Sequence, residues 1–227
     1  MLFLLLGSVY GATNPLFESP DEWSHYPVIK HLADGRGLPK QFPGEAAPYG
    51  IEPLQPPLYY GVMAALTFWI DTDDLPQVRR FNPHNQVGIP LAHGNKNLLI
   101  HTEAERFPWR GTALAVHLIR LLTLACGLGT LFFTYRVARL LWPEARAVAN
   151  LAAALVAFNP MFIFISASVN NDNAAHLTGA AGLWLILLHL QGRTSRRWLI
   201  ALGGVLGLAA LSKLSGLTLW PLAALAV

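Results

Sequence analysis

Apolar residues dominate the second half of the chain, where they form long runs separated by short polar connections. A helix needs roughly 20 predominantly apolar residues to cross a bilayer, and a run that is apolar on all sides is typical of a membrane helix. Gly and Ala within the runs would let such helices pack closely. The pattern therefore predicts an all-α fold, a polytopic transmembrane helix bundle. The predicted transmembrane helices are 112–135, 147–167, 174–190, 198–211 and 214–227.

A shorter apolar run opens the chain at residues 1–12 and is too short to span a bilayer by itself. The hydrophobic region of a signal peptide has a similar composition, but no basic segment precedes this run. We therefore interpret residues 1–12 as a truncated first transmembrane helix. Residues 13–111 follow as one large polar section, and residues 112–227 form the main transmembrane part.

Basic residues in the short connections predict how the helices are oriented. Residues 168–173 contain no Lys or Arg, whereas the connections before and after them are rich in arginine. The positive-inside rule places the two basic connections in the cytoplasm. Residues 168–173 and the section 13–111 then lie outside, because loops longer than about 60 residues cross largely regardless of charge. The sequence predicts an integral protein of the plasma (inner) membrane. The arginines concerned are Arg136, Arg139, Arg146, Arg193, Arg196 and Arg197.

The large extracytoplasmic loop 13–111 is predicted to contain two juxtamembrane helices. Pro20, followed by two acidic residues, is typical of a helix start, and apolar residues then recur at helical spacing to predict a helix at 21–34. A second helix is predicted at 56–70, with aromatic residues suited to the membrane–water boundary. A tilted span is the alternative for 56–70. It would invert the downstream topology, against the arginine-rich connections.

Composition narrows the classes of function. The chain is 53% hydrophobic and 13% charged, which is about half the charged fraction of a soluble domain. The net charge is only +3, and the basic residues form no stripe interleaved with aromatics, so no nucleic-acid partner is expected. The single Cys126 excludes an intramolecular disulfide framework or a cysteine-rich metal site. The expected environment is the lipid bilayer.

Asp21 and Glu22 are the first candidates for chemistry. A simple structural interpretation is a charge pair facing the positive end of the helix dipole. The pair also follows an apolar segment closely enough to lie near the lipid headgroups, where charged residues often mark a functional site. Because adjacent helical residues point about 100° apart, one carboxylate can face a substrate while the other is held structurally. His25 lies one turn later and could orient Asp21 or help to bind a cation.

A second candidate group precedes the run 174–190. Asn171 and Asp172 can cap that helix, and capping is compatible with a role in binding. His176 is four residues after Asp172 and shares its face of the helix. Two such pairs of an acid and a histidine, meeting at one outer cavity, could bind a divalent cation. The metal content is therefore unknown, and no cofactor is certain.

Lys213 is the third candidate, an isolated charge between the last two apolar runs. It either extends to the headgroups or binds a phosphate as a point charge. The sequence contains no glycine-rich phosphate loop, no Ser-His-Asp order and no zinc motif.

With these residues in view, the chain resembles the GT-C superfamily of membrane glycosyltransferases that use polyprenyl-phosphate sugars. The aminoarabinose transferases, protein O-mannosyltransferases and RgtA-like transferases are the similar groups. The resemblance spans almost the whole chain and rests on five segments in the same order. They are Pro-Asp-Glu-Trp-Ser-His-Tyr (20–26), Gln-Pro-Pro-Leu-Tyr-Tyr (55–60), the helix from His117 to Arg136, the segment from Asn159 to Asp172, and Leu-Ser-Lys-Leu-Ser-Gly (211–216).

The resemblance implies an inverting transfer from a polyprenyl-phosphate sugar donor to a lipid, glycan or protein acceptor outside the membrane. It implies Asp21 as the catalytic base, Glu22 as its support, and Asp172 as the residue that orients a substrate. Lys213 would then offset charge on the leaving phosphate. Substrate-binding positions that it suggests are His25, Gln55, Tyr59, Asn171, His176 and Lys213.

Two departures from the family pattern leave the contact to the lipid phosphate and the identity of the acceptor open. Some relatives carry Lys where this chain has Gln55, so a charged contact to the lipid phosphate is lost there, although Gln can donate a hydrogen bond. The section 71–110 is longer than in the aminoarabinose enzymes, and the chain is expected to be an N-terminal fragment. The alternatives are a transporter or flippase of lipid-linked precursors, or a non-catalytic membrane fragment.

Overall fold

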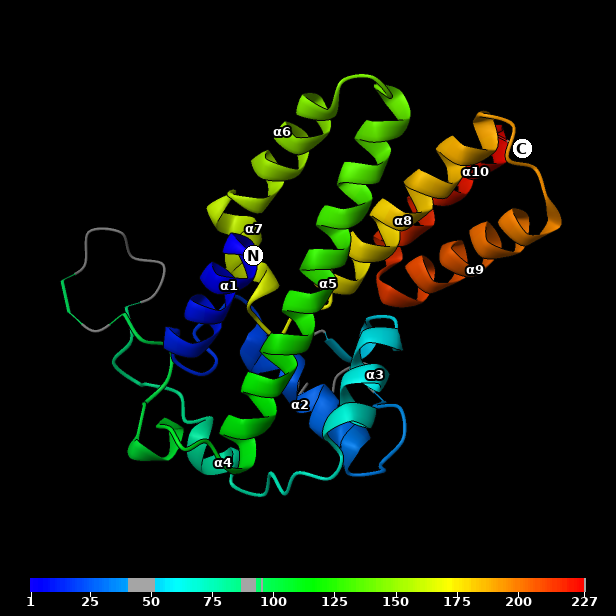
Figure 1. Ribbon diagram of the computed structural model, residues 1–227. Helices are drawn as coiled ribbons and strands as arrows, with labels where there is room; N and C mark the ends of the chain where they lie inside the picture. Colours follow the sequence, from blue (N-terminus) through cyan, green and yellow to red (C-terminus); the bar gives the residue numbers. More distant parts are fainter. Residues whose placement is uncertain (41–51, 87–92, 95, 227) are drawn as a thin grey trace.

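The computed structural model describes residues 1–40, 52–86, 93–94 and 96–226, and most of them are helical (Figure 1). This architecture confirms the predicted helical membrane bundle. The elements are α1 (Leu2–Thr13), α2 (Glu22–Ala33), η1 (Glu52–Leu54), α3 (Leu58–Thr67), α4 (Leu75–Val78), η2 (Glu103–Glu105), α5 (Gly111–Leu141), α6 (Arg146–Ala157), α7 (Pro160–Ser166), α8 (Asp172–Leu190), α9 (Arg196–Ser212), η3 (Leu214–Thr218) and α10 (Leu219–Ala226).

Two helices in the described part of the chain, α5 and α8, are long and apolar enough to cross a membrane. α5 has 31 residues and α8 has 19. α6 and α7 make a third span if they count as one, and they meet at a bend of 65°. The apolar helices α1 and α9 have 12 and 17 residues, below the length of a full span. An integral membrane protein follows from this composition and length.

The apolar run 147–167 is not one straight helix, and the reason is local. The side chain of Asn159 accepts hydrogen bonds from the backbone N–H groups of Met161 and Phe162, at 3.0 and 3.3 Å. This caps the start of α7. Pro160 occupies the first helical position, where it has no N–H to continue α6. The Asn-Pro pair therefore ends one helix and begins the next.

Small residues bring the helices of the bundle close together. At Gly127 in α5, a β-carbon would lie 2.7 Å from the Ser166 hydroxyl of α7 and 2.9 Å from the Phe3 ring of α1. A larger residue would push both neighbours away. This is the close helix packing that small residues permit in membranes.

The two arginine-rich connections lie at the same end of the helices. The side chain of Gln191, just after α8, donates to the backbone carbonyl of Leu140 at the end of α5, at 3.1 Å. The Arg136 guanidinium lies over the Trp184 ring of α8, 5.1 Å from its centroid. The opposite ends of α5 and α8 meet the N-terminal part that contains α2, α3 and α4 (Figure 1). This agrees with the expected topology, while the side of the membrane remains a prediction.

The described part of residues 13–111 forms a packed layer with its own apolar core, which we call the N-terminal layer. α2 packs against α3, and both lie against the first turns of α5. The core keeps the polar residues of α2 in fixed places. Its large, fully buried members include Phe17, Tyr26, Ile29, Tyr59, Tyr60, Leu99 and Ile119.

Candidate active site

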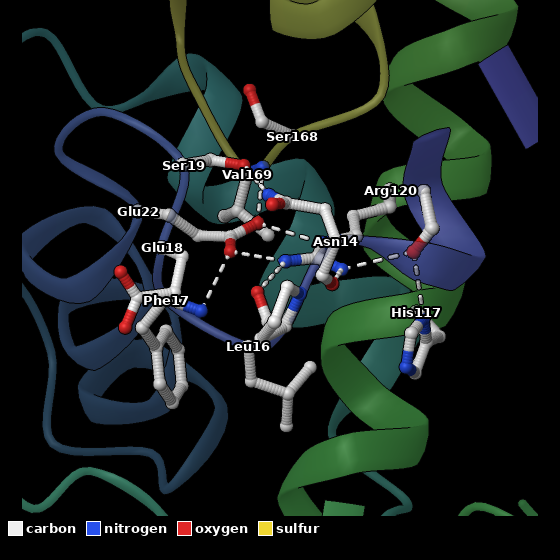
Figure 2. Close-up of polar contacts among 12 residues, drawn as sticks. Asn14, Leu16, Phe17, Glu18, Ser19, Glu22, His117, Arg120, Ser168 and Val169 are labelled. Carbon is white, nitrogen blue, oxygen red and sulfur yellow. Dashed lines mark hydrogen bonds and ion pairs between the residues drawn. The ribbon is translucent and has the colours of Figure 1, made fainter. Parts of the chain in front are cut away.

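Glu22 lies fully buried where the N-terminal layer meets the bundle (Figure 2). The Arg120 guanidinium binds both carboxylate oxygens, with Nε 2.9 Å from Oε1 and Nη2 2.6 Å from Oε2. The backbone N–H groups of Phe17 and Val169 donate to the same carboxylate at 2.9 and 2.8 Å. A buried ion pair needs this kind of two-pronged geometry with its other hydrogen-bonding positions filled. Glu22 is therefore held by the protein itself.

The remaining donors of Arg120 bind the end of α1. Nη1 donates to the carbonyls of Gly11 and Asn14 at 2.9 and 2.7 Å, and Nη2 donates to Pro15 at 3.0 Å. One guanidinium thus joins α1, α2 and α5. Arg120 lies within the segment from His117 to Arg136 that carries the family resemblance, but no role was predicted for it. The signal that could have identified it is an isolated arginine inside an apolar run.

Asp21 differs from the adjacent Glu22 in its exposure to solvent. Its side chain is exposed, while Glu22 is buried. The Asp21 backbone adopts the left-handed conformation with φ 59°, which is uncommon outside glycine and most tolerated by Asn and Asp. Its carbonyl accepts the first hydrogen bonds of α2, from the N–H groups of Ser24 and His25 at 2.9 Å. Of two adjacent carboxylates, the fold buries one and leaves the other accessible.

Asp172 and Lys213 form a second charged group. The Lys213 Nζ lies 2.5 Å from Asp172 Oδ1, and both side chains are about one third exposed, at 31% and 34%. Asp172 is the first residue of α8, and Lys213 directly follows α9. Beside them, the buried Asn171 amide donates to the carbonyl of Ser212 at 3.5 Å. The start of α8 and the end of α9 are therefore joined.

His25 connects α2 with α3 and with η1. Its Nδ1 lies 2.8 Å from the Tyr60 hydroxyl and 3.1 Å from Glu52 Oε2. The Tyr60 hydroxyl donates to the same Glu52 oxygen at 3.0 Å. Neither Glu52 nor Tyr60 was predicted as a site residue. The signals in the sequence were an acidic residue shortly before the Gln-Pro-Pro segment and the second tyrosine within the quoted segment 55–60.

The charged groups of the site also influence one another's pKa values. Burial, followed by the charge of the Lys213 ammonium, lowers the pKa of His25 to about 4, although the Asp172 and Glu22 carboxylates oppose the shift. Burial also raises the pKa of Glu52, and the charge of Asp21 adds to that rise while Lys213 reduces it. We call these neighbours the polar cluster: Asp21, His25, Glu52, Tyr60, Asp172 and Lys213.

The other predicted binding residues lie around this cluster in different environments. Gln55 is half-buried and lines a cavity of about 150 Å³ together with Glu52 and Tyr60. Tyr59 is 1% exposed and packs against the ring of Tyr60, with 5.6 Å between the ring centroids. Its burial raises the pKa of its hydroxyl. His176 is exposed on α8. Tyr59 therefore occupies a core position, whereas Gln55 and His176 are accessible.

The arrangement of potential metal-binding side chains does not support a metal site. Within residues 1–40, 52–86, 93–94 and 96–226, there is no group of three or more His, Cys, Asp or Glu side chains that could hold a metal ion. The divalent cation therefore remains a prediction.

Glu18 fastens a distant segment of the N-terminal layer. Its carboxylate accepts the backbone N–H groups of Leu98 and Leu99, both at 3.0 Å, and lies 2.9 Å from His101 Nε2. His101 Nδ1 in turn lies 2.9 Å from Glu105 Oε2. Glu18 thus has a structural partner set of its own, apart from the polar cluster.

Replacing Glu18 with Ala is expected to loosen the segment that it holds. Two backbone N–H groups would lose a charged acceptor, and bonds of this kind contribute about 1.5–3 kcal/mol each at most. Thermal unfolding in detergent should show a lower Tm, and amide exchange should speed up at Leu98 and Leu99. Glu103→Ala is the control, because Glu103 forms an exposed pair with Arg106. Equal behaviour of the two variants would contradict the anchoring role.

A comparison with known proteins gives a family match for the transmembrane bundle. A family profile described as dolichyl-phosphate-mannose-protein mannosyltransferase matches residues 113–227, which is half of the chain. The matched part runs from α5 to the end and includes Arg120, Asp172 and Lys213. No curated protein and no solved structure gave a significant match. By the family match, the chain belongs to the dolichyl-phosphate-mannose-protein mannosyltransferase family, whose members are membrane glycosyltransferases of the GT-C type.

Proposed function

We propose that the protein transfers a sugar from a polyprenyl-phosphate donor to an acceptor outside the membrane, with inversion at the anomeric carbon. Membership of the family supports transferase activity at a membrane. The observation that carries the proposal is the contrast between two adjacent carboxylates. Glu22 is held by Arg120, whereas Asp21 is an exposed member of the polar cluster. An accessible carboxylate among fixed charges suits a general base.

In the proposed reaction, the acceptor oxygen attacks the anomeric carbon and its proton passes to Asp21. The bond between the anomeric carbon and the phosphate oxygen breaks, and the polyprenyl phosphate leaves with the electron pair. Carboxylates stabilise the positive charge that develops at the anomeric centre in related sugar chemistry. The Lys213 ammonium would offset the negative charge of the leaving phosphate.

Asp172 has a defined place in this proposal because it already binds Lys213 at 2.5 Å. A phosphate that approaches the ammonium must share it with this carboxylate or displace the carboxylate. The released carboxylate could then accept a hydrogen bond from a substrate hydroxyl. This supports Asp172 as an orienting residue and leaves the base role to Asp21. The acceptor can be a lipid, a glycan or a protein.

The activity can be tested with full-length protein in proteoliposomes that contain radiolabelled polyprenyl-phosphate sugars. We expect the label to appear in an added acceptor, together with release of polyprenyl phosphate. The product linkage, measured by NMR, should have the anomeric configuration opposite to that of the donor. Movement of the intact labelled lipid between leaflets, with no cleavage of the sugar–phosphate bond, would show a transporter and overturn the proposal.

A further inference from the structure

The polar cluster contains a buried group of side chains that the proposed reaction does not use. His25, Tyr60 and Glu52 are only 4%, 1% and 6% exposed. They come from α2, α3 and η1, and their polar atoms lie within 3.1 Å of one another. Burial of three polar side chains costs free energy unless they satisfy one another. Their mutual hydrogen bonds satisfy that need and restrict where the protons lie.

The contacts determine which nitrogen of His25 carries the proton. A tyrosine hydroxyl has one proton to donate, and here it is donated to Glu52 Oε2 at 3.0 Å. The Tyr60 oxygen can then only accept from His25 Nδ1, which is 2.8 Å away. Nδ1 also lies 3.1 Å from Glu52 Oε2, and Glu52 in its ionised form can only accept a hydrogen bond. Both contacts require a proton on Nδ1.

The protonation state of Nε2 follows from the neutral charge of the ring. Burial lowers the pKa of His25 to about 4, so the ring is neutral near pH 7. A neutral imidazole with a proton on Nδ1 has a free lone pair on Nε2. Among the described residues, Nε2 has no hydrogen-bond partner. The charges of Lys213 and Asp172 also act on the pKa of the ring, which links it electrostatically to the residues of the proposed reaction.

We propose that Tyr60 and Glu52 are positioning residues that hold His25 as the Nδ1–H tautomer, so that Nε2 accepts a hydrogen bond from a substrate hydroxyl. The proposal rests on the proposed function, because the hydroxyl belongs to the sugar donor or to the acceptor. It adds a defined proton arrangement to a site whose base is Asp21. His25 would touch the substrate, while Tyr60 and Glu52 act through it.

The tautomer can be measured without any substrate. In full-length protein labelled with ¹⁵N at the histidine rings, we expect His25 to show a protonated Nδ1 and an unprotonated Nε2 at pH 7. The His25→Gln variant assigns the signals by their loss. Tyr60→Phe and Glu52→Gln should each increase the Nε2–H tautomer. Tyr26→Phe is the matched control, because Tyr26 is buried in the same core and its hydroxyl is paired with Thr72 and Thr112, away from the His25 ring.

Kinetics then test the link to the substrate. Tyr60→Phe and Glu52→Gln should lower kcat/KM for sugar transfer by roughly three- to tenfold, the size of one neutral hydrogen bond. A rise in the KM for the polyprenyl-phosphate sugar would assign the hydroxyl to the donor. A rise in the KM for the acceptor would assign it to the acceptor. Tyr26→Phe should leave the ¹⁵N signals of His25 unchanged even if it lowers the Tm.

Each outcome separates this proposal from the proposed function. A wild-type ring with its proton on Nε2 would overturn the tautomer assignment, whatever the activity. The expected tautomer, together with variants that alter it and keep full transfer rates, would overturn the contact with a substrate hydroxyl. The expected tautomer in a protein that cleaves no sugar–phosphate bond would instead count against the proposed function.

Discussion

Asp21→Asn is expected to reduce sugar transfer by roughly 10²- to 10⁴-fold, the contribution typical of general acid–base catalysis. Asparagine has nearly the same shape as aspartate but cannot take the acceptor proton. It also tolerates the left-handed backbone conformation at this position. Because Asp21 is exposed and makes no side-chain capping bond to α2, the Tm of the variant in detergent should match that of the wild type. Transfer from a radiolabelled polyprenyl-phosphate sugar measures the rate.

Asp73→Asn is the matched control for this experiment. Asp73 belongs to the same N-terminal layer, and its side chain is 92% exposed and lies 3.4 Å from the Lys30 ammonium. The control should retain normal transfer, and Asp21→Glu should restore part of the activity because it returns a carboxylate at a longer reach. Normal transfer by Asp21→Asn would remove Asp21 from the mechanism and make Glu52 or Asp172 the next carboxylate to examine.

Removing Arg120 is expected to have the largest effect on stability. Arg120→Leu leaves the buried Glu22 carboxylate without its cation, and breaking one side of a buried ion pair typically costs about 3–5 kcal/mol. The carbonyls of Gly11, Asn14 and Pro15 also lose their donor. For a protein of ordinary marginal stability, this change should prevent accumulation of the folded form. Thermal unfolding and expression in membranes measure the effect.

A graded variant keeps this prediction testable if Arg120→Leu fails to fold. Arg120→Lys retains the charge, but an ammonium on a flexible chain cannot bind both Glu22 oxygens and three carbonyls in the planar pattern of a guanidinium. Its Tm should lie between those of Arg120→Leu and the wild type. Arg106→Leu is the control, because Arg106 forms an exposed pair worth about 0–1 kcal/mol. A Tm for Arg120→Leu no lower than the control would contradict the role of the ion pair.

The helices were predictable because membrane helices depend on composition over many residues. The long apolar runs that became α5 and α8 needed no knowledge of their neighbours. The run 147–167 was harder, because its apolar composition hides a break that two residues cause. Asn is a common N-cap residue and Pro is common at the first position of a helix. The Asn159-Pro160 pair could therefore have predicted the bend, but the hydrophobicity of the run could not.

The residues of the candidate site that could be predicted are charged residues next to long apolar runs. Asp172 and Lys213 flank apolar runs, so each was visible singly, and the fold joins them. Glu52 and Tyr60 were missed because their contact with His25 depends on the packing of α2 against α3. Contacts of this kind join residues 35 positions apart, and no local pattern encodes them.

The partners of Glu22 also impose an order on biosynthesis. Arg120 lies 98 residues after Glu22, and Val169 lies 147 residues after it. A growing chain exposes the carboxylate to water until both partners have emerged, because an unpaired charge is too costly to bury. The N-terminal layer therefore closes late, after α5 has entered the membrane and the connection before α8 has returned to the same side. Nascent chains stopped before residue 169 should keep this layer open to protease.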